Sequence, residues 1–177
     1  MEKKKRTQKI VASIKIEPYL AEYISKKYEK HPITGGVKIP YNTDLYFCVW
    51  EHMSRQAVNQ SDIIDANLHI HLPTRKSTSC SPWKDPAYYN YLSASAAKNI
   101  EDQIRRMFNF ELHRVLLENE EFGHQYRNID VIYDFIHRYN LKSISSDALL
   151  KNYYRFRNRV REKKVRKYKK HLSFSNS

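Results

Sequence analysis

The sequence predicts an α+β fold, in which a small N-terminal β-α-β-α-β unit is followed by a helical C-terminal half. Residues 9–16 and 67–72 alternate apolar and polar side chains, as half-buried strands do. From residue 85 onward the apolar side chains recur at helical spacing instead. Only three glycines occur in 177 residues, which disfavours an all-β fold built from many tight hairpins.

The first strand has the sequence KIVASIKI, in which Ile10, Ala12, Ile14 and Ile16 share one face. Pro18 follows at once and suits the first turn of a helix, where its missing N–H leaves no hydrogen bond unmade. We therefore expect a strand that leads directly into an amphipathic helix. The apolar stripe of that helix consists of Leu20, Tyr23, Ile24 and Tyr28.

A loop at 31–36 then leads to a second short strand, GVKIPY, which we expect Pro40 to end because proline cannot donate to a strand ladder. Thr43 or Asp44 is the expected cap of a second helix. The third strand is NLHIHL at 67–72. The inward side chains expected from this helix and strand are Leu45, Val49, Trp50, Met53, Leu68, Ile70 and Leu72.

The chain is expected to divide at residues 73–84, a polar and proline-punctuated stretch that we interpret as an exposed loop between residues 1–72 and 85–177. Asp85-Pro86 then has the form of a helix start. The apolar stripe beyond it fits one helix over 86–119, or two helices that meet near Ser93–Ser95. The members of this stripe are Ile100, Ile104, Met107, Phe108, Leu112, Val115 and Leu116.

Residues 128–161 resemble a helix-turn-helix unit, in which one helix braces a second that enters the major groove. We expect Asn128 to cap the first helix, Asn140 to end it, and Ser145 or Ser146 to cap the second. The turn is longer than the usual three or four residues. The expected inward residues are Ile129, Ile132, Tyr133, Ile136 and Tyr139 in the first helix, and Ala148, Leu149, Tyr153, Phe156 and Val160 in the second.

The net charge of +13 is concentrated at the two ends of the chain. Residues 1–9 carry five cations and one anion, and residues 151–171 carry eleven cations and one anion. Residues 10–150 hold sixteen cations and seventeen anions, so the body of the chain is nearly neutral. Positive charge gathered in this way favours a polyanionic partner such as nucleic acid.

These observations predict a non-catalytic protein that binds nucleic acid, most of all double-stranded DNA, as a regulator or accessory factor. Asn and Arg are side chains that can form paired hydrogen bonds with base edges. The candidates to face the groove are Lys151, Asn152, Arg155 and Arg159, with Tyr154 at the edge of that face. The candidates for phosphate contact are Arg157, Arg161, Lys163, Lys164, Arg166, Lys167, Lys169 and Lys170, helped by the N-terminal KKKR.

Two other functions fit the same charge pattern. The protein could bind structured RNA, whose readers also combine a small α/β unit with basic helices. It could instead be a structural or assembly protein whose basic tail meets an acidic partner. Residues 10–28 also resemble the opening of ribbon-helix-helix repressors, although Pro32, Gly35 and Gly36 interrupt the second helix of that pattern.

No catalytic or metal-binding motif is found in the sequence. His69 and His71 share a strand face, but no third ligand lies at a diagnostic spacing, and Asp62 and Asp65 have no acidic companion motif. We therefore expect no enzyme activity, no cofactor and no metal. Two cysteines and no apolar run of membrane-spanning length predict a protein of the reducing cytoplasm.

Overall fold

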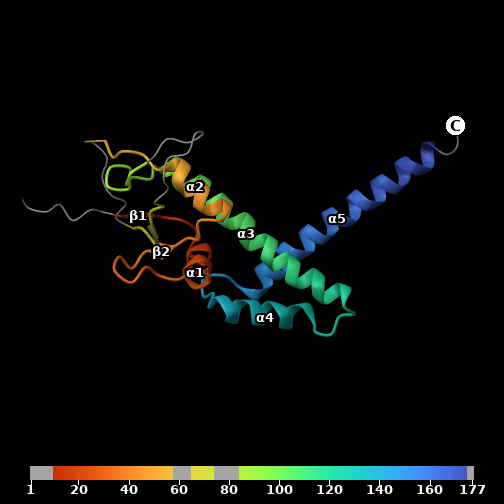
Figure 1. Ribbon diagram of the computed structural model, residues 1–177. Helices are drawn as coiled ribbons and strands as arrows, with labels where there is room; N and C mark the ends of the chain where they lie inside the picture. Colours follow the sequence, from red (N-terminus) through yellow and green to blue (C-terminus); the bar gives the residue numbers. More distant parts are fainter. Residues whose placement is uncertain (1–9, 58–64, 74–83, 175–177) are drawn as a thin grey trace, which may run out of the picture. The chain divides into compact units, whose positions relative to one another are not determined.

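The computed structural model describes residues 10–57, 65–73 and 84–174, with only the backbone from residue 162 onward. The elements, drawn in Figure 1, are β1 (Val11–Ile14), α1 (Pro18–Lys27), β2 (Val37–Lys38), α2 (Asp44–His52), β3 (Leu68–His71), α3 (Ala94–Glu121), α4 (Asn128–Tyr139) and α5 (Ser146–Phe174). One small sheet precedes a helical C-terminal half, so the predicted α+β class is confirmed.

The sheet has the strand order β1-β3-β2, with β3 antiparallel to β1 and parallel to β2. The predicted alternation is confirmed, because Ala12, Ile14, Leu68 and Ile70 are all buried. The resemblance to ribbon-helix-helix repressors is wrong. β1 pairs with β3 of its own chain, and α1 is followed by β2 in place of a second helix.

Gly36 allows β2 to approach the centre of the sheet. A Cβ atom at this position would lie 2.9 Å from the backbone nitrogen of His71 and 3.3 Å from a methyl group of Val11. Real Cβ atoms do not come as close as 2.9 Å to a backbone atom, so only glycine fits here without a shift of the strand.

The first two helices begin where the sequence predicts. α1 starts at Pro18, and α2 starts after Thr43, whose hydroxyl accepts the backbone N–H of Tyr46 at 3.2 Å. At the other end of α2, the ammonium group of Lys84 donates to the carbonyls of Trp50, Glu51 and Met53 at 3.1, 2.7 and 3.0 Å. A cation is favourable there because the last carbonyls of a helix carry partial negative charge.

α3 starts near Ser93–Ser95, where the second predicted alternative places the junction of two helices, but the helix expected before this junction does not form. Residues 86–88 form a turn, and Tyr91 pairs with Ser54 through two backbone hydrogen bonds of 3.0 and 3.1 Å, so the chain from 86 to 92 is not helical. The helix begins at Ala94, after the Ser93 hydroxyl has accepted a backbone N–H. Asp85-Pro86 therefore starts a single turn and not a helix, because Tyr91 forms backbone hydrogen bonds with Ser54.

The chain folds into two compact units, Met1–Phe108 and Asn109–Ser177. The boundary falls inside α3, whereas the predicted division at 73–84 lies outside the described residues except at its two ends. The first turns of α3 belong to the unit that contains the sheet. Their packing residues in that unit are Ala96, Ala97, Ile100, Ile104 and Phe108.

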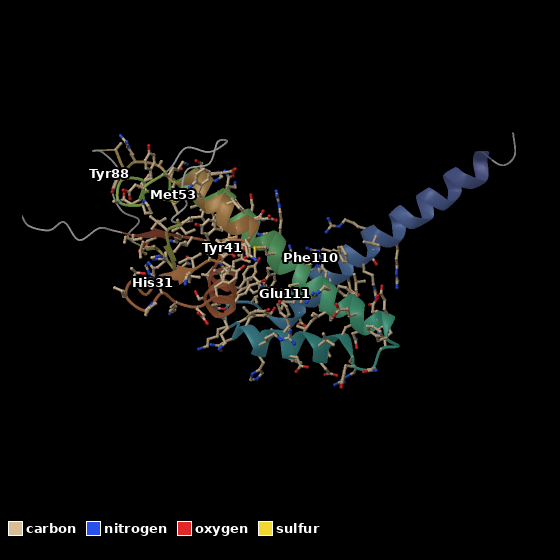
Figure 2. All side chains as sticks on the ribbon, in the orientation of Figure 1. His31, Tyr41, Met53, Tyr88, Phe110 and Glu111 are labelled. Carbon is tan, nitrogen blue, oxygen red and sulfur yellow. The ribbon has the colours of Figure 1, made fainter. Side chains whose placement is uncertain are left out.

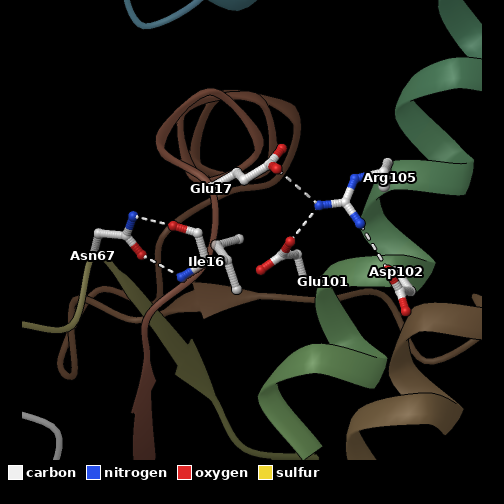
Figure 3. Close-up of polar contacts among 6 residues, drawn as sticks. All are labelled: Ile16, Glu17, Asn67, Glu101, Asp102 and Arg105. Atoms are coloured by element: carbon white, nitrogen blue, oxygen red, sulfur yellow. Dashed lines mark hydrogen bonds and ion pairs between the residues drawn. The ribbon is translucent and has the colours of Figure 1, made fainter. Parts of the chain in front are cut away.

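Two polar clusters fix the start of α1 within the first unit (Figure 3). The guanidinium of Arg105 on α3 bonds to Asp102 at 2.7 Å and pairs with Glu101 and, at 3.1 Å, with Glu17. The side-chain amide of Asn67 bonds to both backbone polar groups of Ile16, at 3.0 and 2.7 Å. A cation at Arg105 is therefore used to hold α1 and α3 together.

In the second unit, α4 ends as predicted at Asn140, which adopts the left-handed conformation with φ 50° and ψ 47°. Two expectations for α4 are wrong. Asn128 is the first helical residue, and its cap is Arg127. Tyr133 is 53% exposed, because the buried face of the helix turns toward Phe135 instead.

Candidate nucleic-acid interface

α4 and the first half of α5 pack side by side, as the predicted helix pair requires (Figure 1). Ser145 caps α5, since its hydroxyl accepts the backbone N–H of Ala148 at 3.3 Å. Leu149 and Tyr153 are buried, in agreement with the expected inward face. Ala148 is exposed, which contradicts its expected inward position.

The opposite face of α5 is basic and open to solvent. Lys151, Arg155 and Arg159 recur every four residues, so they line up along one side of the helix, and all three are exposed. Arg161 is exposed as well, beyond the end of this row. None of the ion pairs among the described side chains involves these four cations. We call Lys151, Arg155 and Arg159 the basic row.

Asn152 does not belong to this face. Its side-chain oxygen accepts a hydrogen bond from the imidazole Nε2 of His113 at 2.7 Å, and its amide nitrogen donates to the side-chain oxygen of Asn109 at 3.2 Å. The outward position expected for Asn152 is therefore wrong. Its amide joins α5 to α3 within the second unit, where it cannot also form a pair of hydrogen bonds with a base.

Arg157 is also held inside the protein. Its guanidinium lies 2.8 Å from a carboxylate oxygen of Glu120 on α3 and 4.6 Å from the ring centre of Tyr154. The side chains of Arg157 and Glu120 are only 25% and 14% exposed. The charge of Arg157 is therefore already matched by a carboxylate inside the protein, which makes Arg157 a weaker candidate for phosphate contact than the exposed cations of α5.

Glu120 interacts with several polar side chains besides Arg157. Burial alone would raise the pKa of Glu120, but the surrounding polar groups of Tyr153, Arg157 and Asn128 outweigh burial and hold the pKa below its ordinary value. The carboxylate is therefore ionised at neutral pH. It links α3 to both other helices of the second unit, because it also accepts the side-chain amide of Asn128 at 3.3 Å.

An apolar hollow of about 320 Å³ lies between α3 and α5. The rings of His113 and Phe156 stack there at 4.1 Å. Phe110, labelled in Figure 2, also lines the hollow and is 71% exposed. Burial lowers the pKa of His113, the positive charge of Arg159 lowers it further, and the hydrogen bond to Asn152 opposes both effects.

The rest of the predicted phosphate-contacting arm is only partly described. The helical backbone of α5 continues to Phe174, and the side chains from residue 162 onward lie outside the described part of the structure. The N-terminal KKKR also lies outside it. These predicted contacts remain predictions. They concern Lys163, Lys164, Arg166, Lys167, Lys169 and Lys170.

Sequence reasoning missed the residues that fix the outward face of α5. Glu120, His113 and Asn109 lie about 40 residues before their partners on α5, and no local pattern marks them. The acidic residues Glu118, Glu120 and Glu121 at the end of α3 could have indicated this pairing. Carboxylates at the end of one helix predict ion pairs with some of the cations on a neighbouring basic helix.

Comparison of the chain with protein-family models, with curated proteins and with solved structures finds no match. Within residues 10–57, 65–73 and 84–174, no helix combines the length and the apolar character needed to cross a bilayer.

Proposed function

We propose that the protein is a non-catalytic nucleic-acid-binding protein that docks the exposed face of α5 on double-stranded DNA. The observation that carries this proposal is the basic row. Its three cations are exposed, stand one above another, and have no carboxylate partner among the described side chains. Arg157 lies two positions from Arg155 and forms an ion pair with Glu120. The exposed cations of the basic row therefore differ from a neighbouring cation whose charge is matched inside the protein.

The spacing of the basic row favours a polyanion. Like charges four residues apart on a helix repel each other, and no ion pair with a described carboxylate offsets this repulsion. Phosphate groups would relieve it and would release the counterions condensed on the nucleic acid. Arg155 and Arg159 can in addition form paired hydrogen bonds with guanine, which supplies sequence preference in a major groove.

The helix pair supports duplex DNA as the polymer. α4 braces α5, and Lys151, at the sixth position of α5, belongs to the N-terminal part that such helices present to base edges. Structured RNA remains the rival, since its readers also use basic helices. A competition experiment separates them: we expect unlabelled duplex DNA to displace a labelled duplex at lower concentration than an RNA hairpin of equal length does.

The decisive variant is the double substitution Arg155→Ala and Arg159→Ala, measured by fluorescence anisotropy with labelled duplex. We expect affinity to fall at least about 30-fold, since each of the two contacts contributes on the order of 1–3 kcal/mol. The matched control is Arg106→Ala, which removes an exposed arginine from α3 in the other unit. Equal affinity of the double variant and the control would refute the proposal.

A further inference from the structure

The sheet has a second face, opposite the core, that carries polar and basic side chains. The strand register aligns them in two rows. Ser13 lies beside His69 in one row, and Val11, His71 and Lys38 lie side by side across all three strands in the other. Each of these side chains is exposed or partly exposed, while their strand neighbours Ile14 and Ile70 are buried.

The loop between α1 and β2 adds two more side chains to this face. The imidazole of His31, labelled in Figure 2, stacks on that of His71, with ring centres 4.1 Å apart and planes 3° from parallel. Thr34 contacts both rings: its backbone N–H donates to Nδ1 of His31 at 3.3 Å, and its hydroxyl lies 3.2 Å from Nδ1 of His71. We call Ser13, His31, Thr34, Lys38, His69 and His71 the histidine face.

The contact with Thr34 fixes the ring proton of His31, and the hydroxyl contacts of His69 and His71 are compatible with the same tautomer. Because Nδ1 of His31 accepts a hydrogen bond, the neutral ring carries its proton on Nε2. The Nδ1 atoms of His69 and His71 are likewise engaged by hydroxyl groups, at 2.8 Å from Ser13 and 3.2 Å from Thr34. With each hydroxyl donating, all three rings keep an Nε2–H group that can donate to a further acceptor.

The charges around the histidine face are mostly positive. Lys38 contributes an exposed ammonium group, and its charge lies near enough to affect His71. Lys15, at the end of the same strand face, is paired with Asp65 at 3.7 Å. Glu29 and Lys30 are exposed on the segment that pairs with β2. No described carboxylate forms an ion pair with Lys38, His31, His69 or His71.

A metal ion is not the ligand that this arrangement favours. Among residues 10–57, 65–73 and 84–174, no group of three or more potential ligands is placed to hold one. N–H donors, hydroxyls and an ammonium group that forms no ion pair with a described carboxylate instead match an oxyanion, which accepts several hydrogen bonds at once.

We propose that the histidine face is a second binding site, which takes phosphate groups through the imidazole Nε2–H donors and the ammonium group of Lys38. The site belongs to the first unit and includes no residue of α5. Its ligand is defined by chemistry as a phosphate oxyanion, either free inorganic phosphate or the phosphodiester of a nucleic acid.

Binding at this site is expected to depend on pH. Burial lowers the pKa of His71, and electrostatic interactions with His31 and Lys38 lower it further, so the His71 ring is largely neutral at pH 7. A bound phosphate favours the protonated ring. By linkage it raises the pKa of His71, and affinity therefore increases as pH falls.

The test is an NMR titration of the imidazole signals of the full-length protein against pH, with and without inorganic phosphate, at an ionic strength matched by chloride. We expect phosphate to raise the apparent pKa of His71 by about one unit, which corresponds to a tenfold preference of phosphate for the protonated ring. A second series uses a short oligonucleotide. Shifts with the oligonucleotide alone assign the site to phosphodiesters, and no shift with either ligand overturns the proposal.

Variants separate this site from the proposed DNA interface. Lys38→Gln changes an exposed side chain, so it should fold normally and lose most of the phosphate-induced shift. His137→Gln, which alters an exposed histidine of α4, should leave the shift unchanged. The Arg155→Ala and Arg159→Ala double variant should also keep the shift, so that failure at either site is visible by itself. A Lys38→Gln protein with an undiminished phosphate response would overturn the proposal.

Discussion

Arg155 and Arg157 stand two positions apart on α5 and have opposite environments. Arg155 is exposed, whereas Arg157 lies against Glu120 and two tyrosine rings. A count of cations treats them alike, but only an unpaired cation is available to a phosphate. At the residue scale, the useful quantity is therefore the number of cations that lack an acidic partner.

The Glu120–Arg157 pair leads to a stability prediction. Replacing Glu120 by Gln leaves the partly buried guanidinium without a countercharge, and we expect a loss of about 1–3 kcal/mol in the free energy of unfolding at pH 7. Urea denaturation measures this loss. The control Glu118→Gln changes a carboxylate that is 52% exposed, and it should alter stability much less.

The same carboxylate predicts a pH dependence. Because the folded pKa of Glu120 is depressed, its contribution is fully present above the ordinary value of 4.5 and is lost as pH falls through the folded pKa. The stability difference between the wild type and Glu120→Gln should therefore shrink in acid. If the two proteins kept a constant difference from neutral pH to below about pH 4, the ionised pair would not be its source.

Gly36 gives a second prediction at this scale. Replacing Gly36 by Ala places a Cβ 2.9 Å from a backbone nitrogen of β3, and we expect it to destabilise the protein by about 1–3 kcal/mol through displacement of β2. Thermal unfolding followed by circular dichroism measures the effect. Ile33→Ala, which changes a side chain that is 89% exposed in the same loop, should leave stability unchanged.

At the scale of elements, a helix end was predictable where a residue next to it in the sequence determines it. Pro18, Thr43 and Asn140 each act within one turn of the chain, and the structure places them as expected. The non-helical conformation of residues 86–92 was not predictable, because it depends on pairing between Tyr91 and the distant Ser54. The orientation of Asn152 was missed for the same reason, since its partner His113 lies 39 residues earlier.

The end of α4 allows a direct test of whether one residue, Asn140, stabilises a helix end through its backbone conformation. Asn140 has φ 50° and ψ 47°, a conformation that costs an ordinary L-residue about 1–2 kcal/mol. We expect Asn140→Ala to lower the free energy of unfolding by roughly 1 kcal/mol and Asn140→Gly to leave it nearly unchanged. Urea denaturation of both variants compares them. Equal losses for alanine and glycine would show that the amide side chain matters more than the backbone conformation.

At the scale of the whole molecule, the order of residues alone shows where the charge is concentrated, but not how many of these cations are available to a partner. The excess sits at the two ends, with ten net positive charges in residues 151–171. The structure assigns one of those eleven cations, Arg157, to internal pairing and leaves the basic row exposed. The strand alternation also placed His69 and His71 on one face, but His31, Thr34 and Lys38 joined them only through the loop and the strand register.

The proposed phosphate-contacting arm and the basic row should contribute differently to DNA binding, so removing each should cause a different defect. Deleting residues 162–177 removes six cations of the proposed phosphate-contacting arm, Lys163, Lys164, Arg166, Lys167, Lys169 and Lys170, and leaves the basic row in place. The logarithm of the binding constant falls with the logarithm of salt concentration by about 0.9 per phosphate neutralised. If all six contact phosphates, the slope should flatten by about 5, with affinity reduced on every sequence alike.

The double variant of Arg155 and Arg159 should behave differently, with an altered preference among duplex sequences and a smaller change in slope. Anisotropy titrations over a series of salt concentrations, on two unrelated duplexes, distinguish the two defects. The matched control removes only residues 175–177, which are uncharged, and should keep the wild-type slope. An unchanged slope after deletion of 162–177 would mean that these cations do not contact the polymer, and DNA binding would then have to come from the basic row alone.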